Sequence, residues 1–382
     1  MNTLSSPQGA FELSRYPIRR NETLRAWDAA DEYILNHLHE EQRLSAGTSI
    51  LIINDQFGGL AVPLAEFSPT VISDSWLAHA GIQENAQRNQ VAEGCISLHT
   101  SLDYPDTAFD IVLIKVPKSL AMLEDQLIRL APCLHNNSIV IAAGMVKAIH
   151  TSTLKLFEKY LGATKTSLAK KKARLIFPTL SAVDTQRHNP YPSRYILEGT
   201  DYEITNHAGV FSRESLDIGT RFFLAHLPRL KEQAKVIDLG CGNGIVGLMA
   251  AHHNPSAEMT FVDESFMAIA SAKETFEKAF SEDRNHNRQA HFVATDCLGG
   301  LAHNHYDCIL NNPPFHQQNA VGDFIAMQMF YESKQALSKQ GELYVIGNRH
   351  LGYHVKLKKL FGNCTTVASN KKFVILKSIK TH

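Results

Sequence analysis

The sequence predicts an α/β protein made of two similar domains in tandem. Short apolar runs rich in β-branched residues alternate with longer helical stretches, which is the pattern of mostly parallel sheets covered by helices. The runs occur in the same order in both halves of the chain, which indicates an ancient duplication. With 382 residues, 44% of them apolar, the chain is long enough for about two hydrophobic cores.

The first half contains six runs that we expect to form or flank strands: ILIINDQFGG, TVISDSW, CISLHTS, FDIVLIKVPKSL, SIVIAAG and KKARLIF. The second half repeats the order with KVIDLGCGNG, MTFVDES, HFVATDC, YDCILNNPPF, ELYVIGN and KKFVILK. In this alignment Asp110 corresponds to Asp307, and Pro117 corresponds to Pro314. The halves differ at two motifs, because the first half has NDQFGGL against DLGCGNG and KVPK against NPPF.

A segment rich in proline, serine and polar residues, FPTLSAVDTQRHNPYPSRY, separates the two copies. Such a composition is typical of a linker, so we place a boundary near residue 190. The predicted domains are residues 1–185 and 192–382.

The composition predicts a cytoplasmic protein without a metal site. No apolar run approaches the roughly 20 residues that cross a bilayer, and the N-terminal segment lacks an apolar signal core, so we expect no membrane association. The six cysteines have no paired short spacing, which argues against a zinc site and against a disulfide framework. We therefore expect reduced thiols.

Basic residues are clustered although the chain has equal numbers of acidic and basic side chains. Eight Lys or Arg and no acid lie between Leu343 and His382, and KTSLAKKKAR carries five basic residues. A third cluster contains Arg15, Arg19 and Arg20. A solvated basic face is the common interpretation of any one cluster, whereas phosphate contact would explain all of them together.

VIDLGCGNGIVGL has the pattern of a strand, a glycine-rich turn and a helix. Gly240, Gly242 and Gly244 allow a tight turn that approaches a ligand closely, next to free amides at a helix N-terminus. The run GNGIVG also matches the dinucleotide fingerprint GxGxxG, so a dehydrogenase remains an alternative at this point.

Three acids follow strands of the second half. Asp238 lies two residues before Gly240, where a carboxylate suits a cationic amino-acid group better than a pyrophosphate. Asp263 lies near the end of MTFVDES, where an acid can accept hydrogen bonds from both ribose hydroxyls. Asp296 in VATDC can accept a hydrogen bond from an adenine amino group. The alternative for each is a carboxylate that only caps a loop.

NNPPF follows the apolar run YDCIL, and two prolines remove two backbone donors, so the segment cannot continue a central strand. Asn312, Pro313, Pro314 and Phe315 then present an amide, a carbonyl and an aromatic face in a stiff loop. This combination suits a flat, polar ligand. The alternative is that the prolines only end a strand and Phe315 belongs to the core.

DLGCGNG, VDES, ATDC and NNPPF together resemble S-adenosylmethionine-dependent methyltransferases that act on exocyclic amines or amides. The resemblance implies two Rossmann-like methyltransferase domains, the N-terminal one degenerate, with S-adenosyl-L-methionine as the cofactor. It implies that the glycine loop and Asp238 face the methionine part, Asp263 the ribose and Asp296 the adenine.

In such an enzyme the acceptor is a poor nucleophile because its lone pair is delocalised. Asn312 Oδ1 and the Pro313 carbonyl would each accept one N–H bond, which stabilises the charge that develops on nitrogen. The rigid prolines hold that carbonyl in place, and Phe315 would stack on the base. His316 is a candidate proton shuttle, with a solvated loop histidine as the alternative.

Nearly the whole chain is similar to the bacterial tandem-domain ribosomal RNA guanine-N2 methyltransferases. NNPPFHQQ, GELYVIGNRHLGY, LKKLFGNCTTVASNKKFVILK and IKVPKSLAMLEDQL resemble the large-subunit members. The resemblance implies methylation of N2 of one guanine in 23S ribosomal RNA, presented as a flipped base. We expect RNA contacts from Lys170, Lys171, Lys172 and Arg174 of the first domain and from Lys356, Lys358, Lys359, Lys371 and Lys372 of the second.

Several alternatives stay open at this stage. An N5-glutamine methyltransferase of proteins, a small-subunit ribosomal RNA guanine-N2 methyltransferase and a DNA adenine methyltransferase would use the same acceptor loop. A ribosome-assembly protein that binds RNA without catalysis is a further alternative. For the first domain we expect a role in positioning RNA, and the alternative is that it only stabilises the second domain.

Overall fold

The predicted fold class is confirmed: the chain is an α/β protein with two seven-stranded sheets. The computed structural model describes residues 3–19, 22–181, 186–211, 213–281, 288–314 and 320–382. The chain divides into two compact units, Met1–Tyr191 and Pro192–His382. The first unit includes the end of the proline-rich segment, because Asn189 Nδ2 donates to Asp125 and the Tyr191 hydroxyl donates to Glu124.

The first unit has a mixed sheet in which the first five strands are parallel and the last two are antiparallel. In spatial order the strands are β5 (Ser97–Thr100), β4 (Thr70–Ser73), β3 (Ile50–Ile53), β6 (Phe109–Lys115), β7 (Leu134–Met145), β9 (Ala173–Pro178) and β8 (Thr164–Thr166). A separate hairpin is formed by β1 (Thr3–Ser6) and β2 (Gly9–Glu12).

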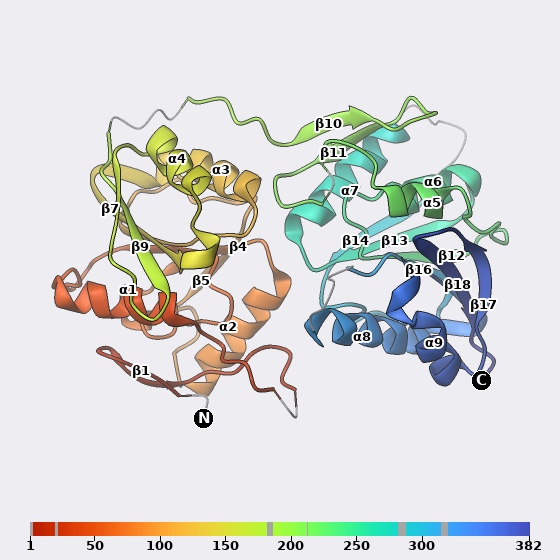
Figure 1. The fold of residues 1–382 in the computed structure, drawn as a ribbon, viewed down its shortest axis with the longest axis horizontal. Helices are drawn as coiled ribbons and strands as arrows, with labels where there is room; N and C mark the ends of the chain where they lie inside the picture. The colour runs from red at the N-terminus through yellow and green to blue at the C-terminus, as the bar shows by residue number, and fades with distance from the viewer. Residues whose placement is uncertain (1–2, 20–21, 182–185, 212, 282–287, 315–319) are drawn as a thin grey trace. The chain divides into compact units, whose positions relative to one another are not determined.

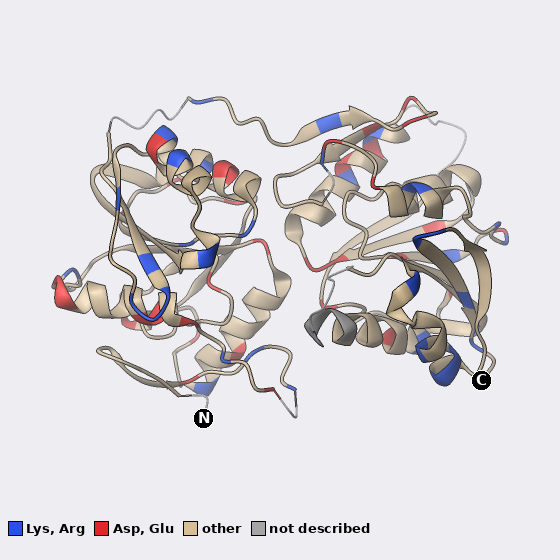
Figure 2. Ribbon diagram, in the orientation of Figure 1, with Lys and Arg blue, Asp and Glu red and all other residues tan. Residues whose placement is uncertain are grey.

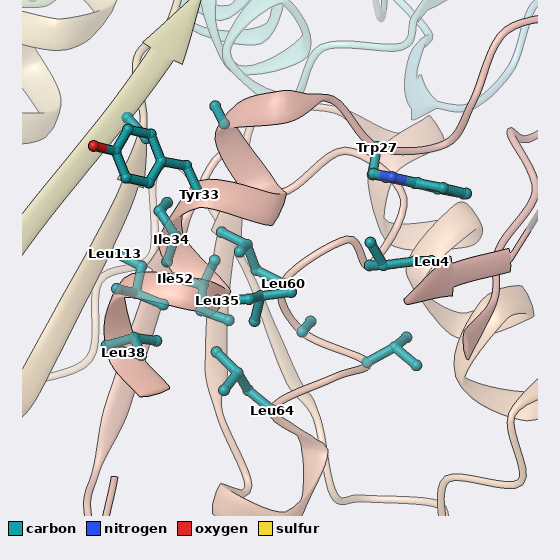
Figure 3. Packing of buried hydrophobic residues seen from close by; sticks show 14 of the residues in the cluster. Leu4, Trp27, Tyr33, Ile34, Leu35, Leu38, Ile52, Leu60, Leu64 and Leu113 are labelled. Atoms are coloured by element: carbon teal, nitrogen blue, oxygen red, sulfur yellow. The ribbon is translucent and has the colours of Figure 1, made fainter. Parts of the chain in front are cut away.

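Helices cover both faces of this sheet (Figure 1). They are α1 (Ala29–Glu40) and α2 (Trp76–Arg88) on one face, α3 (Leu120–Arg129) and α4 (Thr151–Tyr160) on the other, and the short helices η1 (Ala65–Phe67), η2 (Ala131–Cys133) and η3 (Val146–Ala148). Figure 3 shows Ile34, Leu35 and Leu38 of α1 packed toward Ile52 and Leu113 of the sheet. The spacing of these three helix residues places them on one helix face, which explains why α1 docks there.

The second unit repeats this plan. Its sheet contains, in spatial order, β14 (Ala290–Ala294), β13 (Glu258–Asp263), β12 (Lys235–Leu239), β15 (Tyr306–Asn311), β16 (Leu337–Asn348), β18 (Phe373–Ile379) and β17 (Thr365–Ser369). The first five strands are parallel, and β18 and β17 are antiparallel. The strand order is that of the first unit, strand for strand, as the repeated runs predict.

The helices of the second unit also lie on both faces of its sheet (Figure 1). They are α5 (Ile218–Leu224), α6 (Ile245–His253) and α7 (Phe266–Ala279) on one face, with α8 (Ala320–Ala336), α9 (Tyr353–Phe361) and η4 (Arg349–Leu351) on the other. A hairpin of β10 (Ser193–Ile196) and β11 (Glu203–Asn206) precedes them and contacts α7.

Two backbone details fix how the units correspond. Asp110 and Asp307 each accept a hydrogen bond from the N–H that opens the neighbouring strand, at Ser49 and Lys235 respectively. The N–H of Gly240 donates to the Val262 carbonyl at 2.8 Å, and the N–H of Asn54 donates to the Ile72 carbonyl at 2.9 Å. Asn54 therefore corresponds to Gly240, two residues away from the match that the motif letters suggest.

Candidate active site

The glycine-rich turn joins β12 to α6 and lies at the carboxyl edge of the parallel strands, as predicted. Gly240, Gly242 and Gly244 have φ values of 71°, 54° and 79°, in the left-handed region that glycine adopts without strain. A Cβ at Gly242 would meet no atom within 4 Å, so this turn presents open backbone. A Cβ at Gly240 would lie 3.7 Å from the Asn312 carbonyl oxygen, so the glycine-rich turn and the loop that starts at Asn312 are neighbours.

Asp238 is buried beneath this turn with 2% of its surface exposed. Its Oδ2 accepts a hydrogen bond of 2.7 Å from the N–H of Gly247. Burial raises the pKa of Asp238 to about 7, the nearby Asp263 adds to that effect, and the Gly247 N–H opposes it. Within the described ranges no Lys or Arg forms an ion pair with this carboxylate. A cationic group that binds next to it would therefore offset the free-energy cost of burying its negative charge.

Asp263 and Asp296 lie next to the same edge. Asp263 ends β13, and its two oxygens accept from the N–H groups of Gly242 at 3.0 Å and Ser265 at 3.1 Å. Burial raises the pKa of Asp263 above its ordinary value. Asp296 lies two residues beyond the end of β14, and its Oδ2 accepts from Gln328 Nε2 of α8 at 2.9 Å.

The loop that contains Asn312, Pro313 and Pro314, here called the acceptor loop, follows β15, which ends at Asn311. Asn312 Nδ2 donates to the Thr220 hydroxyl of α5 at 3.2 Å. Asn312 Oδ1 is buried and has no hydrogen-bond partner in the described chain. Pro313 is buried and Pro314 is half-buried, while Phe315 and His316 lie outside the described residues. A buried acceptor without a donor is costly, which indicates that a ligand donates to it.

Sequence reasoning missed Thr220 and Gly247, the two residues that hold Asn312 and Asp238 in place. Asp217 caps α5 by accepting from the Thr220 N–H at 3.0 Å, and an Asp before IGTRFFL is a helix-start signal that the sequence shows. No sequence pattern pairs Thr220 with Asn312, because 92 positions separate them. The Phe211 side chain is 78% exposed, so it is not a core residue.

A separate pocket of about 530 Å³ lies against β13 and β14. Thr260, His291, Thr295 and Tyr306 contribute to its lining. Neither Asp238 nor Asn312 lines it, so it is not the acceptor site. It borders the segment that carries Asp296, because Thr295 precedes that residue.

In the first unit the corresponding positions are filled by the chain's own side chains. The Asp55 carboxylate accepts from the N–H groups of Gly58, Gly59, Leu60 and Ala61, at 2.8 to 3.0 Å. Lys115 replaces Asn312 by strand register and lies 2.8 Å from Asp28 and 2.6 Å from Asp31. These contacts occupy both the loop amides and the acceptor position.

Neither a metal centre nor a membrane span emerges from the described ranges. Within them, no group of three or more His, Cys, Asp or Glu side chains is arranged to hold a metal ion. No helix in that part of the chain is long and apolar enough to span a membrane. None of the six cysteines forms a disulfide bond.

Two family models cover most of the chain. The model described as the RLMG N-terminal domain matches residues 1–182, and the model described as the methyltransferase small domain matches residues 201–377. The boundary between them falls in the segment that joins the two compact units.

Relatives match the chain from end to end. Ribosomal RNA large subunit methyltransferase G from Streptomyces avermitilis is 49% identical, covering 99% of both chains, and the Pseudomonas putida protein of that name is 48% identical, covering 100% of both. The solved T. thermophilus 16S rRNA N2 G1207 methyltransferase in complex with AdoMet and guanosine has a TM-score of 0.78. It covers 99% of this chain and 97% of its own at 20% identity, which shows a shared fold. The resemblance stated from the motifs is thus confirmed, and the chain belongs to the ribosomal RNA large subunit methyltransferase G family.

Proposed function

We propose that this chain transfers a methyl group from S-adenosyl-L-methionine to the exocyclic N2 of one guanine in 23S ribosomal RNA. The observation that carries the proposal is the buried, unpartnered Oδ1 of Asn312 next to the glycine-rich turn. The names of the full-length relatives support large-subunit ribosomal RNA as the substrate. The guanosine in the T. thermophilus complex supports guanine as the methylated base.

The residues present fit S-adenosylmethionine. Asp238 is a buried carboxylate that an ammonium group would neutralise, and Gly242 leaves open space beside its backbone. The Asp263 carboxylate accepts backbone N–H groups from Gly242, Glu264 and Ser265, and a carboxylate has about four lone-pair sites, so acceptor capacity is left for a ribose hydroxyl. Asp296 is the candidate for the adenine amino group. When bound, the cofactor supplies an electrophilic methyl group and a neutral leaving group.

The chain's own residues prepare the acceptor nitrogen. Asn312 Oδ1 and the Pro313 carbonyl each accept one N–H bond of the guanine amino group, which aims the nitrogen lone pair away from the loop. As positive charge develops on nitrogen, two oxygens already in place stabilise it without reorganisation. Pro313 and Pro314 fix the backbone of the loop, so little conformational entropy is lost on binding. Stacking of Phe315 on the base stays a prediction.

Two further parts of the proposal depend on the RNA substrate. The guanine must leave any base stack to reach Asn312, so we expect a single-stranded or locally opened site. A ribosomal RNA substrate also implies a cytoplasmic enzyme. N5-glutamine methylation of a protein remains the alternative that uses the same oxygens, because an amide nitrogen is an equally poor nucleophile.

The role of the first unit stays a prediction, with RNA positioning and support of the second unit as the two interpretations. Lys170 Nζ lies 3.7 Å from Glu40, and Lys171 Nζ lies 2.6 Å from Glu32. The Lys170–Glu40 pair is exposed and therefore weak, whereas the Glu32 side chain is only 17% exposed. Both carboxylates repel phosphate. They therefore favour the supporting role for this lysine cluster.

The proposal is tested by mapping the modified nucleoside. The protein is incubated with labelled S-adenosylmethionine and with 23S and 16S ribosomal RNA that lack native modifications, and the products are digested and analysed by mass spectrometry. We expect label as N2-methylguanosine at one position of 23S ribosomal RNA. Label on 16S ribosomal RNA, on adenine or on protein glutamine would contradict the acceptor assignment.

A further inference from the structure

The turn between β17 and β18 carries two lysines and is held in a defined shape. Asn370 Oδ1 accepts from the N–H groups of Lys372 at 2.8 Å and Phe373 at 2.7 Å. The N–H of Arg349 donates to the Lys372 carbonyl at 3.0 Å, which ties this turn to the end of β16. Lys371 and Lys372 therefore lie on a preorganised turn that is bonded to the backbone of Arg349, and these three residues are here called the basic cluster.

The basic cluster stands beside the support of the acceptor loop. Phe373, which follows Lys372, is buried, and its ring would lie 3.2 Å from a Cβ placed on Gly219. The next residue, Thr220, accepts the hydrogen bond that holds Asn312. A chain of direct contacts thus links the basic cluster to the site where the guanine amino group binds.

The basic cluster lies in a segment of the sequence without acidic residues. All three side chains are exposed, and no Asp or Glu occurs between Leu343 and His382. In the described part of the chain none of the three forms an ion pair. Figure 2 shows basic residues without acidic ones at the turn between β17 and β18.

The first unit provides the comparison. By strand register Ile176 matches Leu376, so Lys171 and Lys172 occupy the positions of Lys371 and Lys372. The N–H of Val146 donates to the Lys172 carbonyl at 2.8 Å, so Val146 occupies the position of Arg349. The first unit thus has a turn at the same position, with Lys171 and Lys172 at φ values of 49° and 64°, and has no arginine there.

It also gains acids at this turn. Glu32 and Glu40 of α1 lie against Lys171 and Lys170. Figure 2 shows acidic and basic residues together where the β8–β9 turn meets α1.

We propose that the basic cluster of the second unit binds the phosphates that flank the target guanine, and that the equivalent turn of the first unit does not. The proposal rests on the proposed RNA substrate and assigns the contact to Arg349, Lys371 and Lys372. Three exposed cations that form no ion pair in the described part of the chain attract a polyanion through release of its counterions. Because Phe373 links the basic cluster to the residues that hold Asn312, phosphates bound there orient the RNA strand whose guanine enters the acceptor loop.

The test compares Lys371→Gln with Lys372→Gln as a double variant against the matched double variant Lys171→Gln with Lys172→Gln. Affinity for a 23S ribosomal RNA fragment is measured at several salt concentrations with S-adenosylhomocysteine present. Each lysine lost from a phosphate contact lowers the slope of log affinity against log salt by about 1. We therefore expect a slope reduced by about 2 for the second-unit variant and an unchanged slope for the first-unit variant.

Methylation kinetics complete the test. The second-unit variant should raise KM for RNA far more than it lowers kcat, and Arg349→Gln should do the same to a smaller extent. Equal effects of the two double variants, or an unchanged salt slope in the second-unit variant, would overturn the inference. If wild-type protein binds the fragment with the full slope but labels no guanine, the proposed function fails while the phosphate surface stands.

Discussion

The orientation of one side-chain amide decides which atom of Asn312 faces the acceptor. The Thr220 hydroxyl oxygen accepts from Asn312 Nδ2, which leaves Oδ1 as the buried atom without a partner. If the amide rotated by half a turn, an NH₂ group would face the guanine NH₂ group, and two donors would meet. Thr220 is therefore a positioning residue for the acceptor loop.

Replacing Thr220 with Val removes the acceptor that fixes this amide and keeps the shape of the side chain. We expect kcat to fall by about tenfold to a hundredfold, as for loss of one oriented hydrogen bond at a reacting centre. Thr220→Ser keeps the hydroxyl and should restore most of the rate. The measurement is kcat with saturating RNA and cofactor for the three proteins, and equal rates for the Val and Ser variants would contradict the positioning role.

The buried Asp238 carboxylate lowers the stability of the protein when no cofactor is bound. Its pKa of about 7 lies above the ordinary value of 3.8, so the folded state binds a proton that the unfolded state has lost. The stabilisation by this carboxyl is complete below pH 4 and disappears as pH rises to 7. The cofactor-binding role that we propose for Asp238 would explain why an acid is buried here at a cost to stability.

Asp238→Asn tests both consequences of the raised pKa. Cofactor affinity of the native protein should weaken by about tenfold per pH unit below pH 7, because only the ionised carboxylate pairs with the ammonium group. The variant should bind weakly with no such dependence, and it should melt at a higher temperature than the native protein at pH 8. Calorimetric titration and thermal unfolding between pH 6 and pH 8 measure these effects, and a native affinity independent of pH would contradict the assignment.

At the scale of elements, the first unit keeps a turn after β3, but a side chain of that turn accepts hydrogen bonds from its backbone N–H groups. The Asp55 carboxylate accepts four backbone N–H groups, so these four amides are not available to a ligand. Asn54 takes the position of Gly240 with φ of 68°, which Asn tolerates better than most residues. The degenerate copy therefore keeps the fold and loses the cofactor loop.

Asp55→Ala should destabilise the first unit, because it leaves buried N–H groups without acceptors. The expected loss is on the order of 3 kcal/mol of unfolding free energy. Cofactor affinity should stay at the native value, since the second unit holds that site. Urea unfolding and calorimetric titration of the full chain test this, and a loss of cofactor binding in the folded variant would contradict the division of roles.

The sequence predicted the elements well and the contacts between distant elements poorly. Apolar runs and turn residues have a local cause, so the repeated strand order and the strand end before NNPPF could be read directly. The equivalence of Asn54 in the first unit and Gly240 in the second follows from the register of β3 against β4, which the letters of the motifs do not encode. Thr220 was missed for the same reason, because its role depends on tertiary packing.

At the scale of the whole molecule, the two units share one topology and differ in their chemistry. The family models divide the chain in the same way, with the methyltransferase small domain confined to residues 201–377. We expect one S-adenosylmethionine or S-adenosylhomocysteine molecule to bind per chain. Calorimetric titration measures this ratio, and two sites per chain would contradict the interpretation of the first unit.

The central claim is that Asn312 Oδ1 and the Pro313 carbonyl hold the guanine amino group for methyl transfer. The most direct measurement is the single-turnover rate of Asn312→Ala with ribosomal RNA, after calorimetry has shown that cofactor affinity matches the native protein. We expect the rate to fall by about a hundredfold to a thousandfold, as for removal of one preorganised partner of a developing charge. An unchanged rate in the folded, cofactor-binding variant would contradict the claim.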